Sequence, residues 1–212
     1  LEKMMTPECV YPWTDGFQWN EEWLTKSVRR FPELGQTNDR NNLMLNQIRC
    51  VFGDIPTDLD GFIFASQSVQ AEAMKFFVEK WRAGKFSPFS GIIWWNVRDG
   101  WPLISDAVTD YWCSKKLAYY YIRHAQQSIC CMIRDSENSY DLVAVNDTQE
   151  KADVQIRISD VASGRLIHEG SALIEANGKT LVTHLAKENS NGIYLIEYQV
   201  GGRTFRNHYL YG

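Results

Sequence analysis

The chain has 212 residues, of which 44% are apolar and 23% charged, and its formal net charge is −4. This balance is typical of a globular protein and excludes intrinsic disorder, collagen and coiled coils. The longest apolar runs, residues 61–65 and 91–95, are far shorter than the roughly 20 residues that a membrane-spanning helix needs. We therefore expect no membrane partner.

Acidic and basic residues are evenly mixed along the chain. Up to residue 127, 14 Lys and Arg residues stand against 15 Asp and Glu residues, and after it 8 stand against 11. Proteins that bind nucleic acids need an excess of basic residues to contact the phosphates. Nucleic acid is therefore not an expected partner.

The cysteines and histidines show no metal-binding or redox pattern. No C-x-x-C pair and no metal-ligand spacing of histidines occurs. We interpret the cysteines as small buried hydrophobic residues, and we expect Cys130 and Cys131 to point to opposite faces of a strand. The full set is Cys9, Cys50, Cys113, Cys130 and Cys131.

The first part of the chain is expected to be mainly helical. Helical patterns, including apolar residues at three- and four-residue steps, predict four helices, over residues 21–30, 38–50, 57–83 and 115–127. Residues 91–95 form a short, continuous apolar run, which predicts a fully buried strand. All eight tryptophans lie in this part of the chain.

From residue 128 onward the apolar residues recur with a period of two. This pattern predicts seven strands, over residues 128–135, 140–146, 152–159, 165–174, 180–185, 192–199 and 203–210. About seven short strands in about 85 residues is typical of an immunoglobulin-like β-sandwich. The sequence therefore predicts an α/β part followed by an all-β part, with the boundary between residues 127 and 128.

Two stretches of the first part carry a resemblance to a known enzyme family. One is Ser66-Gln67-Ser68-Val69-Gln70-Ala71-Glu72-Ala73; the other is Gly91-Ile92-Ile93-Trp94-Trp95-Asn96-Val97-Arg98-Asp99-Gly100-Trp101-Pro102, followed by Asp110-Tyr111, Lys116 and Tyr119-Tyr120. In this order they resemble the C-terminal end of glycoside hydrolase family 2 enzymes, above all the β-mannosidase branch. The resemblance implies that residues 1–127 are the last quarter of a (β/α)8 barrel, with its eighth strand at 91–96, and that residues 128–212 are the sandwich domain that follows it.

The resemblance also implies a saccharide site. Active sites of such barrels lie at the C-terminal ends of the strands, so the residues expected to bind a β-linked oligosaccharide or glycoside are Trp95, Asn96, Arg98, Asp99 and Trp101. An indole face packs on the C–H face of a sugar, and a fixed carboxylate can bind its hydroxyls. The alternative is that the tryptophans only pack inside the protein, which we favour for Trp94. Asn96 and Arg98 stand where the family usually has Gln and Asn, which leaves the identity of the sugar open.

The family hydrolyses β-glycosides with retention, using two carboxyl groups about 5–5.5 Å apart. By the order of the motifs, both carboxylates are expected before Leu1, so no catalytic residue is assigned here. Asn20-Glu21 resembles the acid/base pair but lies too few residues before strand eight. Asp110 is expected to pair with Lys115 or Lys116. The resemblance implies no metal and no cofactor.

Two hypotheses follow. In the first, the chain is a C-terminal fragment of a retaining exo-β-glycosidase and is inactive alone, which agrees with a first residue other than Met. In the second, it is a stand-alone carbohydrate-binding or structural module with a tryptophan-lined face. An incomplete barrel should pack Ile92, Ile93 and Trp94 against its own helices or against a second copy of the chain. If the chain comes from a polysaccharide-degrading bacterium, we expect export to the periplasm or medium.

Overall fold

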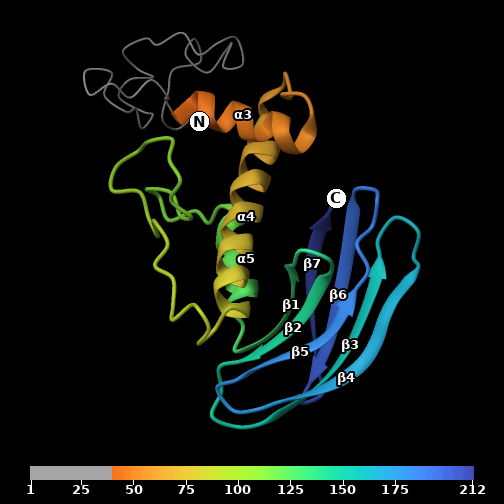
Figure 1. Cartoon of the computed structure of the whole chain (residues 1–212). Helices are drawn as coiled ribbons and strands as arrows, with labels where there is room; N and C mark the ends of the chain where they lie inside the picture. Colours follow the sequence, from red (N-terminus) through yellow and green to blue (C-terminus); the bar gives the residue numbers. More distant parts are fainter. Residues whose placement is uncertain (1–39) are drawn as a thin grey trace. The chain divides into compact units, whose positions relative to one another are not determined.

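The computed structural model describes residues 40–212 (Figure 1). The predicted helix over 21–30, Asn20-Glu21 and Cys9 lie outside these residues. The described residues group into two compact units. We call residues 40–74 and 94–121 the helical unit, and residues 75–93 and 122–212 the sandwich unit. No helix among the described residues is long and apolar enough to cross a membrane.

The helices confirm most of the predicted helical pattern. Their bounds are α3 (Arg40–Phe52), α4 (Leu59–Ala83) and α5 (Leu117–Ala125). Asp58 starts α4 as an N-cap, because its carboxylate accepts a hydrogen bond of 2.7 Å from the amide of Gly61. The core of the helical unit is built by α3 and the first turns of α4, and consists of Leu45, Ile48, Phe62, Ala65 and Val69.

The seven predicted strands are all present and form two antiparallel sheets. One sheet has the order β1-β2-β5 and the other the order β4-β3-β6-β7. The bounds are β1 (Ile129–Asp135), β2 (Tyr140–Asn146), β3 (Ala152–Asp160), β4 (Leu166–Ile174), β5 (Lys179–Leu185), β6 (Gly192–Val200) and β7 (Arg203–Tyr211). The structure thus confirms the predicted fold class, a mainly helical part followed by a β-sandwich.

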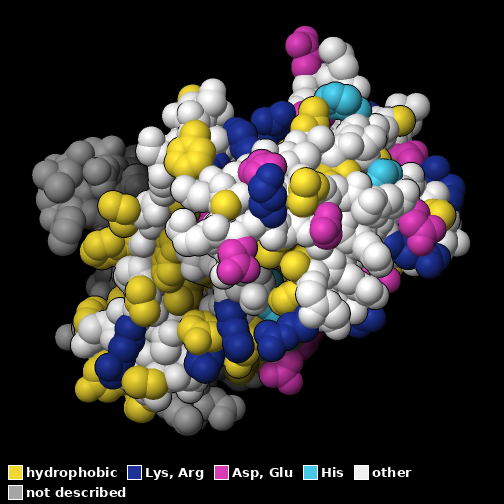
Figure 2. Space-filling view, turned by 90° about the horizontal axis from the view of Figure 1, so that it is seen from below, with side chains coloured by type: hydrophobic (Ala, Val, Ile, Leu, Met, Phe, Trp, Pro, Cys, Tyr) yellow, Lys and Arg dark blue, Asp and Glu magenta, His cyan; other side chains and the backbone are white. Residues whose placement is uncertain are grey.

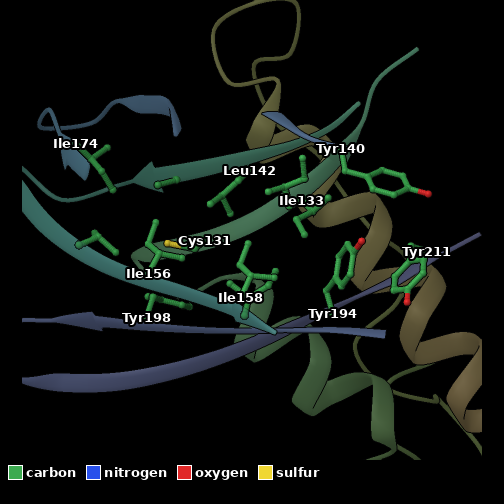
Figure 3. Packing of buried hydrophobic residues seen from close by; sticks show 14 residues of the cluster. Cys131, Ile133, Tyr140, Leu142, Ile156, Ile158, Ile174, Tyr194, Tyr198 and Tyr211 are labelled. Atoms are coloured by element: carbon green, nitrogen blue, oxygen red, sulfur yellow. The ribbon is translucent and has the colours of Figure 1, made fainter. Parts of the chain in front are cut away.

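The sandwich core follows from strand alternation. In β3, Val154, Ile156 and Ile158 are buried, whereas the residues between them face away from the core. These side chains meet others from the opposite sheet, and a group of tyrosines closes one end (Figure 3). Tyr194 and Tyr211 stack there with ring centroids 4.2 Å apart. The regular period therefore yields one continuous core between the sheets.

Strand β2 is buried on both faces, because a second apolar cluster lies on the other side of its sheet. Cys131 belongs to the core between the sheets, whereas Cys130 packs with Met132, Val143, Val145 and Ala83 from the end of α4. The prediction that the two cysteines point to opposite faces is confirmed. Burial raises the pKa of the Cys130 thiol to about 12, which keeps it neutral.

Two of the other cysteines correct the prediction of general burial. Cys50 and Cys113 are both exposed. Cys50 lies on the side of α3 that faces away from the core formed with α4. Cys113 lies in a turn with a φ of 67°, so its position is set by the turn and not by packing.

The last turns of α4 join the sandwich unit through basic side chains. Arg82 donates hydrogen bonds to the carbonyls of Ala125 and Gln127 and, at 2.7 Å, to the carboxylate of Asp147. Lys85 donates to the other oxygen of Asp147 at 2.6 Å. Residues 75–93 therefore group with the strands. The predicted domain boundary between residues 127 and 128 stays a prediction.

The predicted eighth barrel strand is not formed in the described part of the chain. Residues 91–95 belong to no strand, and Ile93 is fully exposed. Ile92 and Trp94 are only half-buried. A continuous apolar run is the signature of a strand that lies between two other strands and under two covering layers. The described residues provide no such neighbours, so the run joins no sheet.

Candidate functional site

The five predicted site residues lie on one loop of the helical unit, between α4 and α5. We call residues 95–101 the tryptophan loop. Trp95 is 75% exposed and Trp101 47% exposed, whereas Asp99 is buried. The peptide bond between Trp95 and Asn96 is cis. The loop thus carries two indoles at the surface and one carboxylate in its interior.

Backbone hydrogen bonds pair the loop with residues 108–109. The amides of Val108 and Thr109 donate to the carbonyls of Asn96 and Val97 at 3.1 and 3.0 Å. The amide of Asp99 donates in return to the carbonyl of Thr109 at 3.1 Å. This short ladder fixes the path of the chain immediately after Trp95.

The side chain of Asp99 is the centre of a polar network. One of its oxygens accepts a hydrogen bond from the hydroxyl of Ser105, and the other lies 3.6 Å from the ammonium of Lys116. Lys116 also donates to the carbonyl of Ser105 at 3.0 Å. Burial lowers the pKa of Lys116, and the charge of Asp99 opposes that shift. The network therefore holds a buried ion pair beneath the loop.

Two buried acceptors of this region have no hydrogen-bond partner among the described residues. They are Oδ1 of Asn96 and Oδ2 of Asp99. For Asp99 Oδ2, the charge of Lys116 is the compensating interaction. Asn96 is half-buried and adjoins the exposed indole of Trp95.

The two glutamines of the S-Q-x-x-Q motif connect α4 to the same region. Gln70 donates a hydrogen bond of 2.6 Å to the carbonyl of Asp106. Gln67 accepts one of 2.9 Å from the amide of Leu117, the first residue of α5. The first stretch, on α4, is therefore hydrogen-bonded to the segment that follows the tryptophan loop and to the start of α5.

Arg98 is exposed and is held by Tyr111. Its guanidinium donates to the carbonyl of Tyr111 at 2.8 Å and lies 5.8 Å from the centroid of that ring. Tyr111 in turn contacts Trp112 edge to face, with centroids 5.6 Å apart. The cationic head of Arg98 is therefore at the surface beside further aromatic side chains.

The sequence did not predict the roles of Ser105 and Lys116 in holding Asp99. We expected Asp110 to pair with Lys115 or Lys116, but its carboxylate accepts a hydrogen bond of 2.7 Å from the amide of Ser114 within a turn. Lys116 lies within ion-pair distance of Asp99 instead. No helical or strand period relates these positions, so only the order of the family motifs could have pointed to them.

Comparisons with known proteins show which proteins this chain is similar to. No protein-family model matches the chain. It is 32% identical over 130 residues to β-mannosidase B of Aspergillus niger, an alignment that covers 53% of this chain and 15% of that protein. It is 28% identical over 145 residues to β-mannosidase B of Emericella nidulans, covering 58% and 17%. The chain thus spans only a small part of the length of these curated relatives.

Solved structures agree with the sequence relatives. The β-D-mannosidase of Dictyoglomus thermophilum superposes with a TM-score of 0.70 at 25% identity, covering 81% of this chain and 22% of that one. The exo-chitosanase CsxA of Amycolatopsis orientalis superposes with a TM-score of 0.62 at 18% identity, covering 78% and 21%, and supports the fold alone. In sequence and in fold, the chain is therefore similar to the C-terminal part of glycoside hydrolase family 2 enzymes of the β-mannosidase type.

Proposed function

We propose that this chain is the C-terminal part of a retaining exo-β-glycosidase, and that it supplies a saccharide-binding loop but neither catalytic carboxylate. The observation that carries the proposal is the tryptophan loop, which presents the indoles of Trp95 and Trp101 above the buried pair of Asp99 and Lys116. The sequence similarity to β-mannosidases supports a β-linked glycoside as the substrate class.

The chemistry of the loop suits a sugar. A large exposed indole gains free energy when the apolar C–H face of a pyranose covers it. Asn96 and Arg98 on the same loop carry amide and guanidinium groups, and such groups can bind hydroxyls. Both residues depart from the family pattern, so we propose the class of β-linked glycosides and do not name the sugar.

Among the described residues the buried carboxylates are all engaged, Asp141 by Arg134 and Asp160 by Tyr211. Asp99 is held by Ser105 and Lys116. Glu79 on α4 forms a buried ion pair of 3.0 Å with Lys75 and accepts a hydrogen bond of 2.8 Å from Asn207. Retaining hydrolysis requires a carboxylate pair about 5–5.5 Å apart that faces the scissile bond. We therefore propose that the catalytic pair belongs to an upstream part of the enzyme.

A direct assay tests this proposal. The purified 212-residue chain is incubated with the 4-nitrophenyl β-glycosides of mannose, glucose and glucosamine, and its folding is checked by circular dichroism. We expect no release of nitrophenol above the buffer rate. Sustained turnover by the folded chain would contradict the proposal.

The exposed indoles also suit the second hypothesis, a stand-alone carbohydrate-binding module. Calorimetric titration with manno-oligosaccharides separates the two. Binding that is lost in Trp95→Ala and Trp101→Ala would favour the module. The absence of binding by the unsubstituted chain would favour a site that needs the upstream part of the enzyme.

A second surface supports an incomplete barrel. On the last turns of α4, Phe77 contacts Phe76 and Trp81, and Trp81 stacks on Phe89 with centroids 4.5 Å apart. Phe76 and Phe77 are each about half exposed. Figure 2 shows hydrophobic side chains gathered at the surface with Lys and Arg side chains beside them. Exposed aromatic surface of this kind marks a protein contact, and we propose that upstream barrel elements or a second copy cover it.

A further inference from the structure

Lys116 is a largely buried lysine of the helical unit that pairs with Asp99. Its side chain is only 18% exposed and that of Asp99 only 2%, so the ion pair between them is largely removed from water. The ammonium also donates to the carbonyl of Ser105. Lys116 therefore contacts both residues that hold the interior of the tryptophan loop.

Asp99 links the loop directly to Thr109 and Ser105, and through Ser105 to Ala107. Its amide binds the carbonyl of Thr109, its carboxylate binds the hydroxyl of Ser105, and that hydroxyl accepts a hydrogen bond of 3.0 Å from the amide of Ala107. A buried carboxylate keeps such a position only if its charge is compensated. Lys116 is the cation within ion-pair distance of this carboxylate in the described part of the chain.

We propose that Lys116 is a positioning residue for the saccharide-binding loop: by neutralising Asp99 it keeps residues 95–101 in the geometry that presents Trp95 and Trp101. The part of this inference that concerns saccharides rests on the proposed function. The part that concerns the order of the loop stands on the contacts alone.

Single and double substitutions of the ion pair should have different effects. Removing one partner of a buried ion pair leaves an uncompensated charge, which is strongly destabilising. Replacing both partners by neutral groups that can hydrogen-bond to each other restores a satisfied interior. Lys116→Met should therefore release the loop, whereas the double variant Asp99→Asn with Lys116→Gln should hold it.

Hydrogen exchange on the 212-residue chain measures the order of the loop directly. The amides of Asp99, Val108 and Thr109 report on it, because all three are hydrogen-bonded in the short ladder. In Lys116→Met we expect these amides to exchange at least about tenfold faster, with the amides of the sandwich unit unchanged. The double variant should exchange nearly as slowly as the unsubstituted chain.

Lys115→Met is the matched control. Lys115 is the adjacent lysine, but it is exposed and its ammonium lies over the ring of Tyr119 at 4.7 Å, outside the Asp99 network. This variant should leave the three loop amides unchanged. If Lys116→Met fails to fold, the comparison of Asp99→Asn with the double variant decides the question, since only the single variant leaves a buried charge unpaired.

Saccharide affinity is measured separately, by titrating the tryptophan fluorescence of each variant with methyl β-D-mannoside and manno-oligosaccharides. We expect the affinity to fall at least about tenfold in Lys116→Met and to recover in the double variant. Unchanged exchange of the loop amides in Lys116→Met would overturn the inference, whatever the saccharide result. Faster exchange in that variant, with no saccharide binding by the unsubstituted chain, would support the positioning role and indicate that saccharide binding needs the upstream part of the enzyme. The proposed function fails separately, through turnover of glycosides by the isolated chain.

Discussion

The sandwich unit and the helical unit are stabilised in different ways. The sandwich unit has a continuous apolar core to which both sheets contribute, and an alternating strand such as β3 supplies a side chain to it every second residue. In the helical unit the tryptophan loop has a short backbone ladder and one buried ion pair. The two sheets therefore enclose their own core, whereas the tryptophan loop depends on a few polar contacts and leaves its indoles exposed.

The largest expected effect concerns the attachment of α4 to the sandwich unit. Lys75→Met removes the partner of buried Glu79 and the donor to the carbonyl of His208, so the free energy of unfolding should fall by about 3–5 kcal/mol. Lys80→Met, on the same helix but exposed, should cost less than about 1 kcal/mol. Urea denaturation followed by circular dichroism measures both. If the two substitutions lower the free energy of unfolding equally, the buried ion pair adds no stability beyond that of an exposed lysine.

A core substitution tests whether the sandwich is independent of the loop. Ile156→Ala leaves a cavity between the sheets and should lower the free energy of unfolding by about 2–5 kcal/mol. Exchange of the Thr109 amide under native conditions should not change, because that amide belongs to the helical unit. The exposed Ile193 serves as the control, and its replacement by alanine should have a much smaller effect.

Acid should weaken the sandwich through Asp141. Burial opposes ionisation of this carboxyl, but hydrogen bonds from Arg134, Ser136, His184 and Ser139 outweigh it and hold its pKa well below the usual value. A depressed folded-state pKa contributes stability above the unfolded-state value of about 3.9, and this stability is lost as the pH falls further. Asp141→Asn should therefore reduce stability at pH 7 by about 2 kcal/mol and flatten the decline below pH 4. Thermal melts from pH 7 to pH 2 measure this decline. If the melting temperature of Asp141→Asn falls below pH 4 as steeply as that of the unsubstituted chain, another group causes the acid sensitivity.

The smallest effect concerns self-association. Phe77→Ser reduces the exposed aromatic surface on α4 and should weaken concentration-dependent association in sedimentation velocity without changing the melting temperature by more than a few degrees. Val161→Ser, at an exposed apolar position in the turn after β3, should leave association unchanged. If the chain stays monomeric at every concentration, a second copy does not cover this surface. Upstream barrel elements would then be the remaining proposed cover.

Local patterns predicted the fold well where local contacts decide it. The period of two along residues 128–212 predicted all seven strands, and the three- and four-residue steps between apolar residues from Ile63 to Trp81 predicted α4. The prediction of an eighth strand over Gly91 to Trp95 was wrong for the described residues, because such a run needs neighbouring strands that they do not supply. Propensity alone could not reveal that dependence.

The site could be predicted only in part. The family motifs pointed to Trp95, Asn96, Arg98, Asp99 and Trp101, and the structure brings them onto one loop. The burial of Asp99 and its link to Lys116 came from tertiary contacts between positions 17 residues apart. The carboxylate that we expected to bind sugar hydroxyls is held in the interior, and its contact with a sugar stays a prediction.

The central claim is tested most directly by the kinetics of the longer enzyme that we propose, in which an upstream barrel precedes this chain. Trp95→Ala should lower kcat/KM for a 4-nitrophenyl β-glycoside by about 10- to 100-fold, because the sugar loses its apolar platform. Trp112→Ala, which removes an exposed indole outside the tryptophan loop, should change it far less. Equal kcat/KM values for Trp95→Ala and the unsubstituted enzyme would contradict the claim that this loop binds the substrate.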